Sequence, residues 1–179
     1  DWGARVTAKL GLSHGDKVVG IHTTSTTSPT PYLGPGSKEL SEEEKDMLHQ
    51  RDQWLAAEGG YSHIQSTKPQ TLSYGLNDSP AGLAAWIVEK YRRWSDCGDD
   101  VETRFTKEDL LTTVTIYWVT QSINSSTRLY YEAFSKAWNL DKDEKIQVPV
   151  AVAAFPSENT VPLREWSERG YNVQHWPDM

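Results

Sequence analysis

The chain has 179 residues, enough for one domain of ordinary size with a hydrophobic core. Its formal net charge is −7 and it has no cluster of Lys and Arg, which argues against nucleic acid or an anionic membrane as the main partner. A single cysteine, Cys97, excludes an internal disulfide and a thiolate metal site, and no apolar run has the length of a membrane span.

The first sixty residues alternate between helical and extended patterns. Apolar residues at a spacing of four predict a helix over 2–12, and "KVVGIHT" (17–23) is typical of a short buried strand. A loop rich in Thr, Ser, Pro and Gly follows over 23–37. Ser41 then opens a capping box, which predicts a helix that runs to about Glu58, before two glycines.

The middle of the chain is mostly helical in pattern. Residues 61–78 are predicted to be extended and irregular, and a helix starts at Pro80 with an apolar stripe at spacings of four, four and three. The run 110–123 is ambiguous because its β-branched residues favour a strand, whereas its apolar spacing fits a helix. We predict a helix there because a capping signal at Thr106 precedes it. A further helix is predicted over 125–138.

The last third of the chain returns to the extended pattern. "IQVPVAVAAF" (146–155) indicates a buried strand, "PLREWSERG" (162–170) a short helix, and "YNVQHW" (171–176) a last strand. A block of helices between short buried strands predicts an α/β sheet with the helical block inserted at its edge. Three strands are few for such a sheet, so we expect its other strands to lie outside this sequence.

Four segments resemble motifs of one family. The run 61–94, "YSHIQSTKPQTLSYGLNDSPAGLAAWIVEKYRRW", resembles the lid segment of the microsomal-type epoxide hydrolases, a branch of the α/β-hydrolase superfamily. "INSSTRLYYEAF" (123–134) resembles a second lid motif, and "VPVAVAAFPSE" (148–158) resembles the strand and loop with the acidic member of the triad. "DWG" (1–3) is similar to the second half of the nucleophile elbow of that family.

The resemblance implies the C-terminal part of an α/β-hydrolase core with an inserted helical lid. Core segments are expected over 1–23, with the nucleophile-elbow helix and a strand, and over 137–179, with the acidic triad residue. The lid is expected over 24–136. The family pattern places further strands before Asp1 and a Gly-Gly-His segment with the catalytic base after Met179. We therefore expect an internal piece, inactive when made alone.

The resemblance also implies site residues. Asp1 is expected to be the nucleophile, a carboxylate that attacks an epoxide carbon to form an ester. The hydroxyls of Tyr61 and Tyr130 are expected to donate to the epoxide oxygen. The backbone N–H of Trp2 is expected to donate to the oxyanion of ester hydrolysis, and Glu158 to orient the His that activates water.

Neighbouring residues offer weaker alternatives for these roles. Tyr131 follows Tyr130 directly, and on a helix the two side chains point about 100° apart, so we expect one of them to face the site. Glu165 and Asp178 are less favoured orienting acids than Glu158. None of the five histidines matches the position of the base: His175 lies ahead of that segment, and His63, in the lid motif, is a candidate for shaping the pocket.

The function implied by the resemblance is addition of water to an apolar epoxide to give a vicinal diol, as in detoxification or aromatic hydrocarbon catabolism. The reaction needs no cofactor and no metal, and its partners are the epoxide and water. The alternatives are another hydrolase with an Asp nucleophile, such as a dehalogenase, and an inactive relative that serves as a binding module. A cytoplasmic location is favoured, unless an anchor lies upstream. The sequence leaves open which epoxide is used and whether the protein forms a homodimer.

Overall fold

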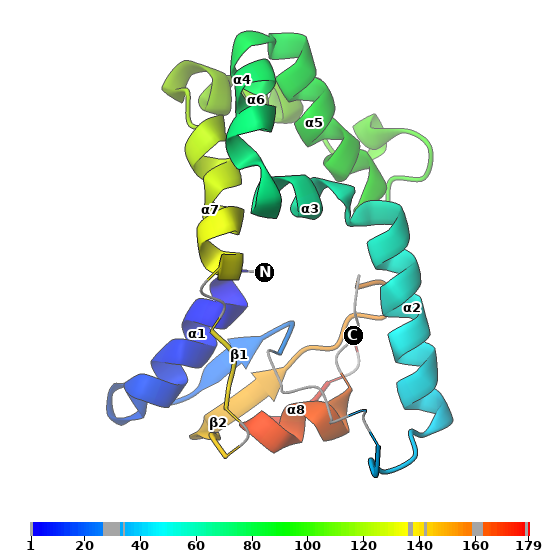
Figure 1. Cartoon of the computed structure of the whole chain (residues 1–179), viewed down its shortest axis with the longest axis vertical. Coiled ribbons are helices and arrows are strands. Elements are labelled where there is room, and N and C mark those ends of the chain that lie inside the picture. The colour runs from blue at the N-terminus through cyan, green and yellow to red at the C-terminus, as the bar shows by residue number, and fades with distance from the viewer. Residues whose placement is uncertain are drawn as a thin grey trace. The chain divides into compact units, whose positions relative to one another are not determined.

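The computed structural model describes residues 2–26, 33, 35–135, 138–141, 143–158, 163–177 and 179. The chain forms two compact units (Figure 1). The sheet unit comprises Asp1–Glu58 and Trp138–Met179, and the helical unit comprises Gly59–Ala137. Each unit has a hydrophobic core of its own. The lid predicted over 24–136 thus covers most of the helical unit together with residues 24–58 of the sheet unit, and its boundaries stay a prediction.

The sheet unit is built on a parallel sheet of strand order β1-β2-β3, as a buried α/β sheet requires. The predicted strands are confirmed, although β1 begins at Ile21 and not at Lys17, which is the last residue of a 3₁₀ turn over Gly15–Lys17. The side chains that face the core alternate with exposed ones along β2, and Ile146, Val150 and Val152 are almost fully buried. The strands are β1 (Ile21–Thr23), β2 (Ile146–Val152) and β3 (Tyr171–His175).

Helix α1 (Trp2–Ser13) packs on β1 and β2 through a close approach at Gly11 (Figure 1). A β-carbon at Gly11 would lie 3.1 Å from Ile146 Cγ2, 3.2 Å from Val148 Cγ2 and 3.5 Å from Ile21 Cδ1. The C-terminal part of α1 therefore covers the starts of two strands. It follows that α1 runs antiparallel to the strands and that its N-terminus points to their carboxyl ends.

Two further helices of the sheet unit, α2 (Glu42–Glu58) and α8 (Arg164–Gly170), are joined through Glu44. The indole N–H of Trp166 donates to Glu44 Oε1, and the backbone N–H of Ser41 donates to Glu44 Oε2 at 2.9 Å. Ser41 Oγ in turn accepts from the Glu44 N–H at 3.2 Å, so the predicted capping box is confirmed. The bonds from Trp166 and from the Ser41 N–H thus satisfy the carboxylate of a residue that is only 8% exposed.

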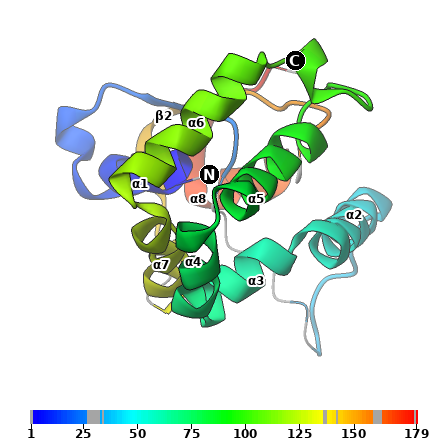
Figure 2. The same cartoon turned by 90° about the horizontal axis from the view of Figure 1, so that it is seen from above.

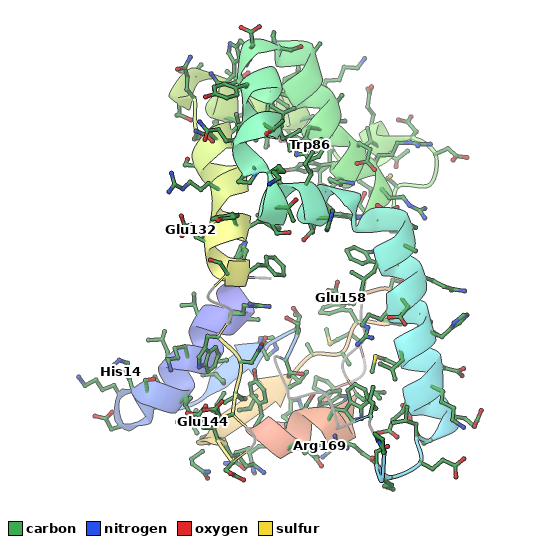
Figure 3. The ribbon with its side chains drawn as sticks, viewed as in Figure 1. His14, Trp86, Glu132, Glu144, Glu158 and Arg169 are labelled. Atoms are coloured by element: carbon green, nitrogen blue, oxygen red, sulfur yellow. The ribbon has the colours of Figure 1, made fainter. Side chains whose placement is uncertain are left out.

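The core of the helical unit joins four helices through Leu76, Leu83, Val114 and Ile123, and a fifth helix, α3, packs on α4 and α7. Figure 2 shows α5 and α6 side by side, and α4 packs on both α5 and α7. The side chain of Trp86, seen in Figure 3, packs against this core together with Trp118. The helices are α3 (Gly60–Thr67), α4 (Pro69–Asp78), α5 (Pro80–Arg93), α6 (Lys107–Thr120) and α7 (Ile123–Ser135), with a 3₁₀ turn at Val101–Thr103.

The extended conformation predicted for 61–78 is wrong, because this segment forms α3 and α4. Pro69 is the first residue of α4, where the missing N–H has no role in the helix. Hydroxyls in this segment bond to carbonyls of their own helix: Thr67 Oγ1 donates to His63 O at 2.7 Å, and Ser73 Oγ donates to Pro69 O at 2.7 Å. Packing of one face on α7 then decides for the helix.

The helix predicted for the ambiguous run 110–123 is confirmed as α6. Thr106 and Asp109 form a complete capping box, and Gln121 ends the helix in the left-handed conformation at φ 51°. The cap thus outweighs the β-branched residues that follow it. No helix in the described part of the chain combines the length and apolar character that crossing a membrane requires.

Candidate active site

The helical unit brings Tyr61 and Tyr130 into contact. Tyr61 is the second residue of α3, Tyr130 lies in the second half of α7, and the two helices pack on each other. Their ring centroids are 5.9 Å apart at an interplanar angle of 77°, an edge-to-face pair. Two phenols separated by 69 positions in the sequence therefore meet at one place, as two donors to a single oxygen atom must.

The structure places Tyr130, and not Tyr131, beside Tyr61. Tyr130 is half-buried, whereas Tyr131 is 46% exposed and lines a separate surface cavity with Lys68 and Arg128. The difference is the 100° rotation between successive residues of a helix. Phe134, one turn after Tyr130, stacks on its ring at a centroid distance of 6.3 Å and extends the aromatic surface along α7.

Burial raises the pKa of Tyr130 to about 12, from an ordinary value of 10.0. The interaction with Tyr61 acts in the same direction, through charge and through a hydrogen bond, while a hydrogen bond with Gln65 opposes it. A phenol with a raised pKa remains protonated over the whole neutral range. Tyr130 therefore has a proton to donate at neutral pH.

The ring of Tyr61 is held by α5 as well as by α7. Trp94, just after α5, meets it edge to face at 5.1 Å between centroids. Lys90 Nζ lies 5.2 Å from the Tyr61 ring centroid and 5.1 Å from that of Trp94. A cation over two aromatic faces stabilises their arrangement by about 0.5–1 kcal/mol per contact at exposed sites. Three helices thus fix the orientation of one phenol.

At the carboxyl edge of the sheet lie two further expected site residues, Trp2 and Glu158. Trp2 is the first residue of α1, so its N–H lies at the positive end of the helix dipole, which points to this edge. The nucleophile position, Asp1, lies outside the described residues. In open parallel sheets this edge is where ligands bind, which agrees with the expected location of a nucleophile elbow.

Glu158 lies in the turn that follows β2 (Figure 3). The sheet continues loosely beyond the strand: the N–H of Ala153 donates to Thr23 O at 3.0 Å and that of Ala154 to Pro177 O at 3.3 Å. The chain then turns, with the N–H of Glu158 donating to Phe155 O at 3.2 Å. The carboxylate is exposed at the carboxyl edge of the sheet. A residue at this place can reach a His that approaches the same edge.

Of the four remaining candidates, the structure describes Glu165, His175 and His63. Glu165 is exposed in the first turn of α8, and Asp178 lies outside the described residues. His175 ends β3 and is exposed, and His63 is exposed on α3. Among the residues with described positions, no group of three or more His, Cys, Asp or Glu side chains could hold a metal ion.

Three neighbours of the Tyr pair were not anticipated. Gln65 lies one helical turn after Tyr61, but that relation is visible only once 60–67 is known to be a helix. Lys90 and Trp94 are four residues apart at the end of α5, and this i, i+4 spacing is the sequence signal that puts them on one face of the helix. Nothing in the sequence indicated that this end of α5 meets α3.

The chain is similar in sequence and in structure to known proteins. It is 35% identical over 191 residues to epoxide hydrolase 1 of Sus scrofa, covering 96% of this chain and 42% of the relative. The crystal structure of juvenile hormone epoxide hydrolase from Bombyx mori matches 98% of the chain with a TM-score of 0.79 and 30% identity. The Aspergillus niger epoxide hydrolase matches all of it, with a TM-score of 0.77 and 28% identity. No family model matches the chain.

Over nearly its whole length the chain is homologous to epoxide hydrolases, and its structural neighbours are epoxide hydrolases of the α/β-hydrolase fold. The expected fold class is thereby confirmed: a partial α/β-hydrolase core with helices inserted between its strands. The chain spans 42% of the length of the Sus scrofa relative, and 44% and 46% of the two solved structures.

Proposed function

We propose that the whole gene product hydrolyses an apolar epoxide to a vicinal diol through an ester on Asp1. The observation that carries this proposal is the Tyr61–Tyr130 contact, because two neutral phenols side by side form a donor pair for one developing alkoxide. The sequence relatives, which are named epoxide hydrolases, support the same reaction.

In the first step a carboxylate oxygen of Asp1 attacks an epoxide carbon, and the bond from that carbon to the epoxide oxygen breaks. The electron pair goes to the oxygen, which takes a proton from the Tyr pair. A neutral phenol suits this role because it donates without placing a second charge beside the nucleophile. The products of the step are a hydroxyalkyl ester and a phenolate that is reprotonated from solvent.

In the second step water attacks the carbonyl carbon of the ester. A His oriented by Glu158 removes a proton from the water, and the N–H of Trp2 donates to the oxyanion. The intermediate collapses and the diol leaves with the proton returned by the His. The acid left on Asp1 releases the second proton of the water to solvent, so Asp1 is again a carboxylate that now contains one oxygen from water. None of the five histidines of this chain has the position of that base, so we propose that it lies outside the 179 residues.

Isotope labelling of a single turnover tests covalent catalysis. The gene product, in excess over the epoxide, reacts in water labelled with heavy oxygen. The label is then expected in Asp1, and the first-turnover diol is expected to be unlabelled at the new hydroxyl. If all of the label enters that first diol, water attacks the epoxide directly and the ester mechanism is wrong.

A further inference from the structure

We propose that Gln65 is a positioning residue for Tyr130: its side-chain amide donates to the phenol oxygen and holds that oxygen beside Tyr61. The proposal deepens the proposed function and rests on it, since it concerns the same ring-opening step. Gln65 touches neither the epoxide nor the nucleophile in the proposed reaction, and it acts through Tyr130.

The placement of Gln65 carries the argument. It follows Tyr61 by one helical turn on α3, so the two side chains share the face that packs on α7. Gln65 is only 5% exposed. Buried amides cost free energy unless they are hydrogen-bonded, so a Gln in this position is expected to serve a specific partner. Its hydrogen-bond partner across the helix interface is Tyr130.

The direction of the bond with Gln65 follows from the chemistry of the two groups. An amide N–H donates and a phenol oxygen accepts, so a Gln that stabilises the phenolate must do so through its N–H. This bond lowers the pKa of Tyr130, whereas Tyr61 raises it through charge and through a hydrogen bond. The Gln65 amide therefore donates to Tyr130 at the place where Tyr130 meets Tyr61.

The hydrogen bond from Gln65 assists proton transfer from Tyr130 to the epoxide oxygen. When Tyr130 gives up its proton, negative charge grows on its oxygen, and the hydrogen bond from Gln65 becomes stronger. An interaction that is stronger in the transition state than in the ground state raises the rate of the chemical step. Gln65 therefore offsets part of the penalty that burial imposes on the phenolate.

Gln65→Met tests the role, with Gln70→Met as the matched control, since Gln70 is exposed on α4 and its side-chain amide donates to Tyr74 Oη at 2.9 Å. In the whole gene product, Gln65→Met is expected to slow ester formation by about tenfold, the equivalent of one hydrogen bond. Hydrolysis of the ester is expected to keep its rate, because that step does not use the phenols. Gln70→Met is expected to leave both rates unchanged.

Two further measurements separate positioning from a structural effect. In a Tyr130→Phe background, Gln65→Met is expected to cause no additional loss, because its partner oxygen is absent. The ζ-carbon NMR resonance of Tyr130 is expected to move in Gln65→Met and to stay in place in Gln70→Met. Gln65→Asn, which keeps a buried amide but is too short to reach, is expected to behave like Gln65→Met and serves if the latter does not fold.

The proposal is overturned if Gln65→Met forms the ester at the wild-type rate, if its loss is the same in the Tyr130→Phe background, or if the Tyr130 resonance does not move. The resonance is independent of turnover. A protein without epoxide hydrolysis in which Gln65→Met still moves the resonance would therefore contradict the proposed function and leave the Gln65–Tyr130 bond supported.

Discussion

The hydroxyl oxygens of Ser73 on α4 and Thr127 on α7 lie 2.6 Å apart inside the helical unit, where the two residues are 2% and 0% exposed. Ser73 Oγ also lies 2.7 Å from Pro69 O, and Thr127 Oγ1 3.0 Å from Asn124 O. Two hydroxyl protons serve three contacts, so two of these are hydrogen bonds at any time. This link joins α7, which carries Tyr130, to α4.

Removal of both members of this pair is expected to cost less stability than the sum of the two single removals. Thr127→Val leaves a buried Ser73 hydroxyl without its partner across the interface, which costs about 1–3 kcal/mol. Ser73→Ala combined with Thr127→Val removes both polar groups and is expected to cost less than the sum of the two single changes. Urea unfolding measures these differences, with Thr112→Val on the exposed face of α6 as the control. Strictly additive losses would show that the two hydroxyls do not interact.

Tyr130 is expected to make stability depend on pH in the alkaline range. Its pKa is about 12 in the folded chain and near 10 when unfolded, so the unfolded chain loses the proton first as the pH rises. The stabilising contribution is complete below pH 10 and is lost as the pH approaches 12. Tyr130→Phe is expected to flatten this part of the stability curve, whereas Tyr74→Phe, at a residue 69% exposed, leaves it unchanged. The same slope in wild type and Tyr130→Phe would contradict the raised pKa.

Gly11→Ala is expected to destabilise the sheet unit although Ala is the better helix former. The gain in helix propensity is about 1 kcal/mol. The new β-carbon would lie 3.1 Å and 3.2 Å from methyl groups of Ile146 and Val148, whose strand is held on both sides, so the strain outweighs that gain. A β-carbon at Gly3, in the same helix, would have no neighbouring atom within 4 Å, so Gly3→Ala is expected to be neutral or slightly stabilising. Thermal unfolding decides, and a raised melting temperature for Gly11→Ala would refute the close packing.

Glu44 is expected to link α2 to α8 most strongly when it is ionised. Hydrogen bonds from Trp166 and Ser41 hold the pKa of Glu44 below its usual 4.5. The stabilisation is therefore present above pH 4.5 and is lost as the pH falls through the lowered pKa. Glu44→Gln is expected to lower stability at pH 7 and to make no difference in strong acid, while Glu43→Gln, at an exposed residue of the same turn, has little effect at either pH. A gap between wild type and Glu44→Gln that is independent of pH would contradict this account.

The elements that the sequence predicted correctly are those with strong local signals. The capping boxes at Ser41 and Thr106 begin the helices that they predicted, and the apolar runs predicted to be buried form the strands of the sheet. The segment 61–78 failed because its Ser, Thr and Pro residues are turn formers by local preference. Their hydroxyls bond within the helices, and packing on α7, which no local pattern expresses, overrides that preference.

The sequence pointed to candidate site residues one by one but not to their arrangement. Family motifs pointed to Tyr61 and Tyr130, and helical geometry predicted that only one of Tyr130 and Tyr131 faces the site. The 5.9 Å contact of Tyr61 with Tyr130 depends on how α3 packs on α7. Gln65 was missed for the same reason: its position one turn after Tyr61 has meaning only on a helix. Periodicity identifies the faces of helices, and tertiary packing decides which faces meet.

The rate of ester formation in the Tyr61→Phe, Tyr130→Phe double variant tests the central claim most directly. Rapid mixing of an epoxide with the gene product follows the single-turnover formation of the Asp1 ester. We expect the double variant to fold normally and to form the ester at least about a hundredfold more slowly, because general acid catalysis typically contributes a factor of that size. Tyr74→Phe combined with Tyr131→Phe, at two exposed residues of the helical unit, is expected to keep the wild-type rate. Ester formation at a near-normal rate in the Tyr61→Phe, Tyr130→Phe protein would contradict the role of the pair.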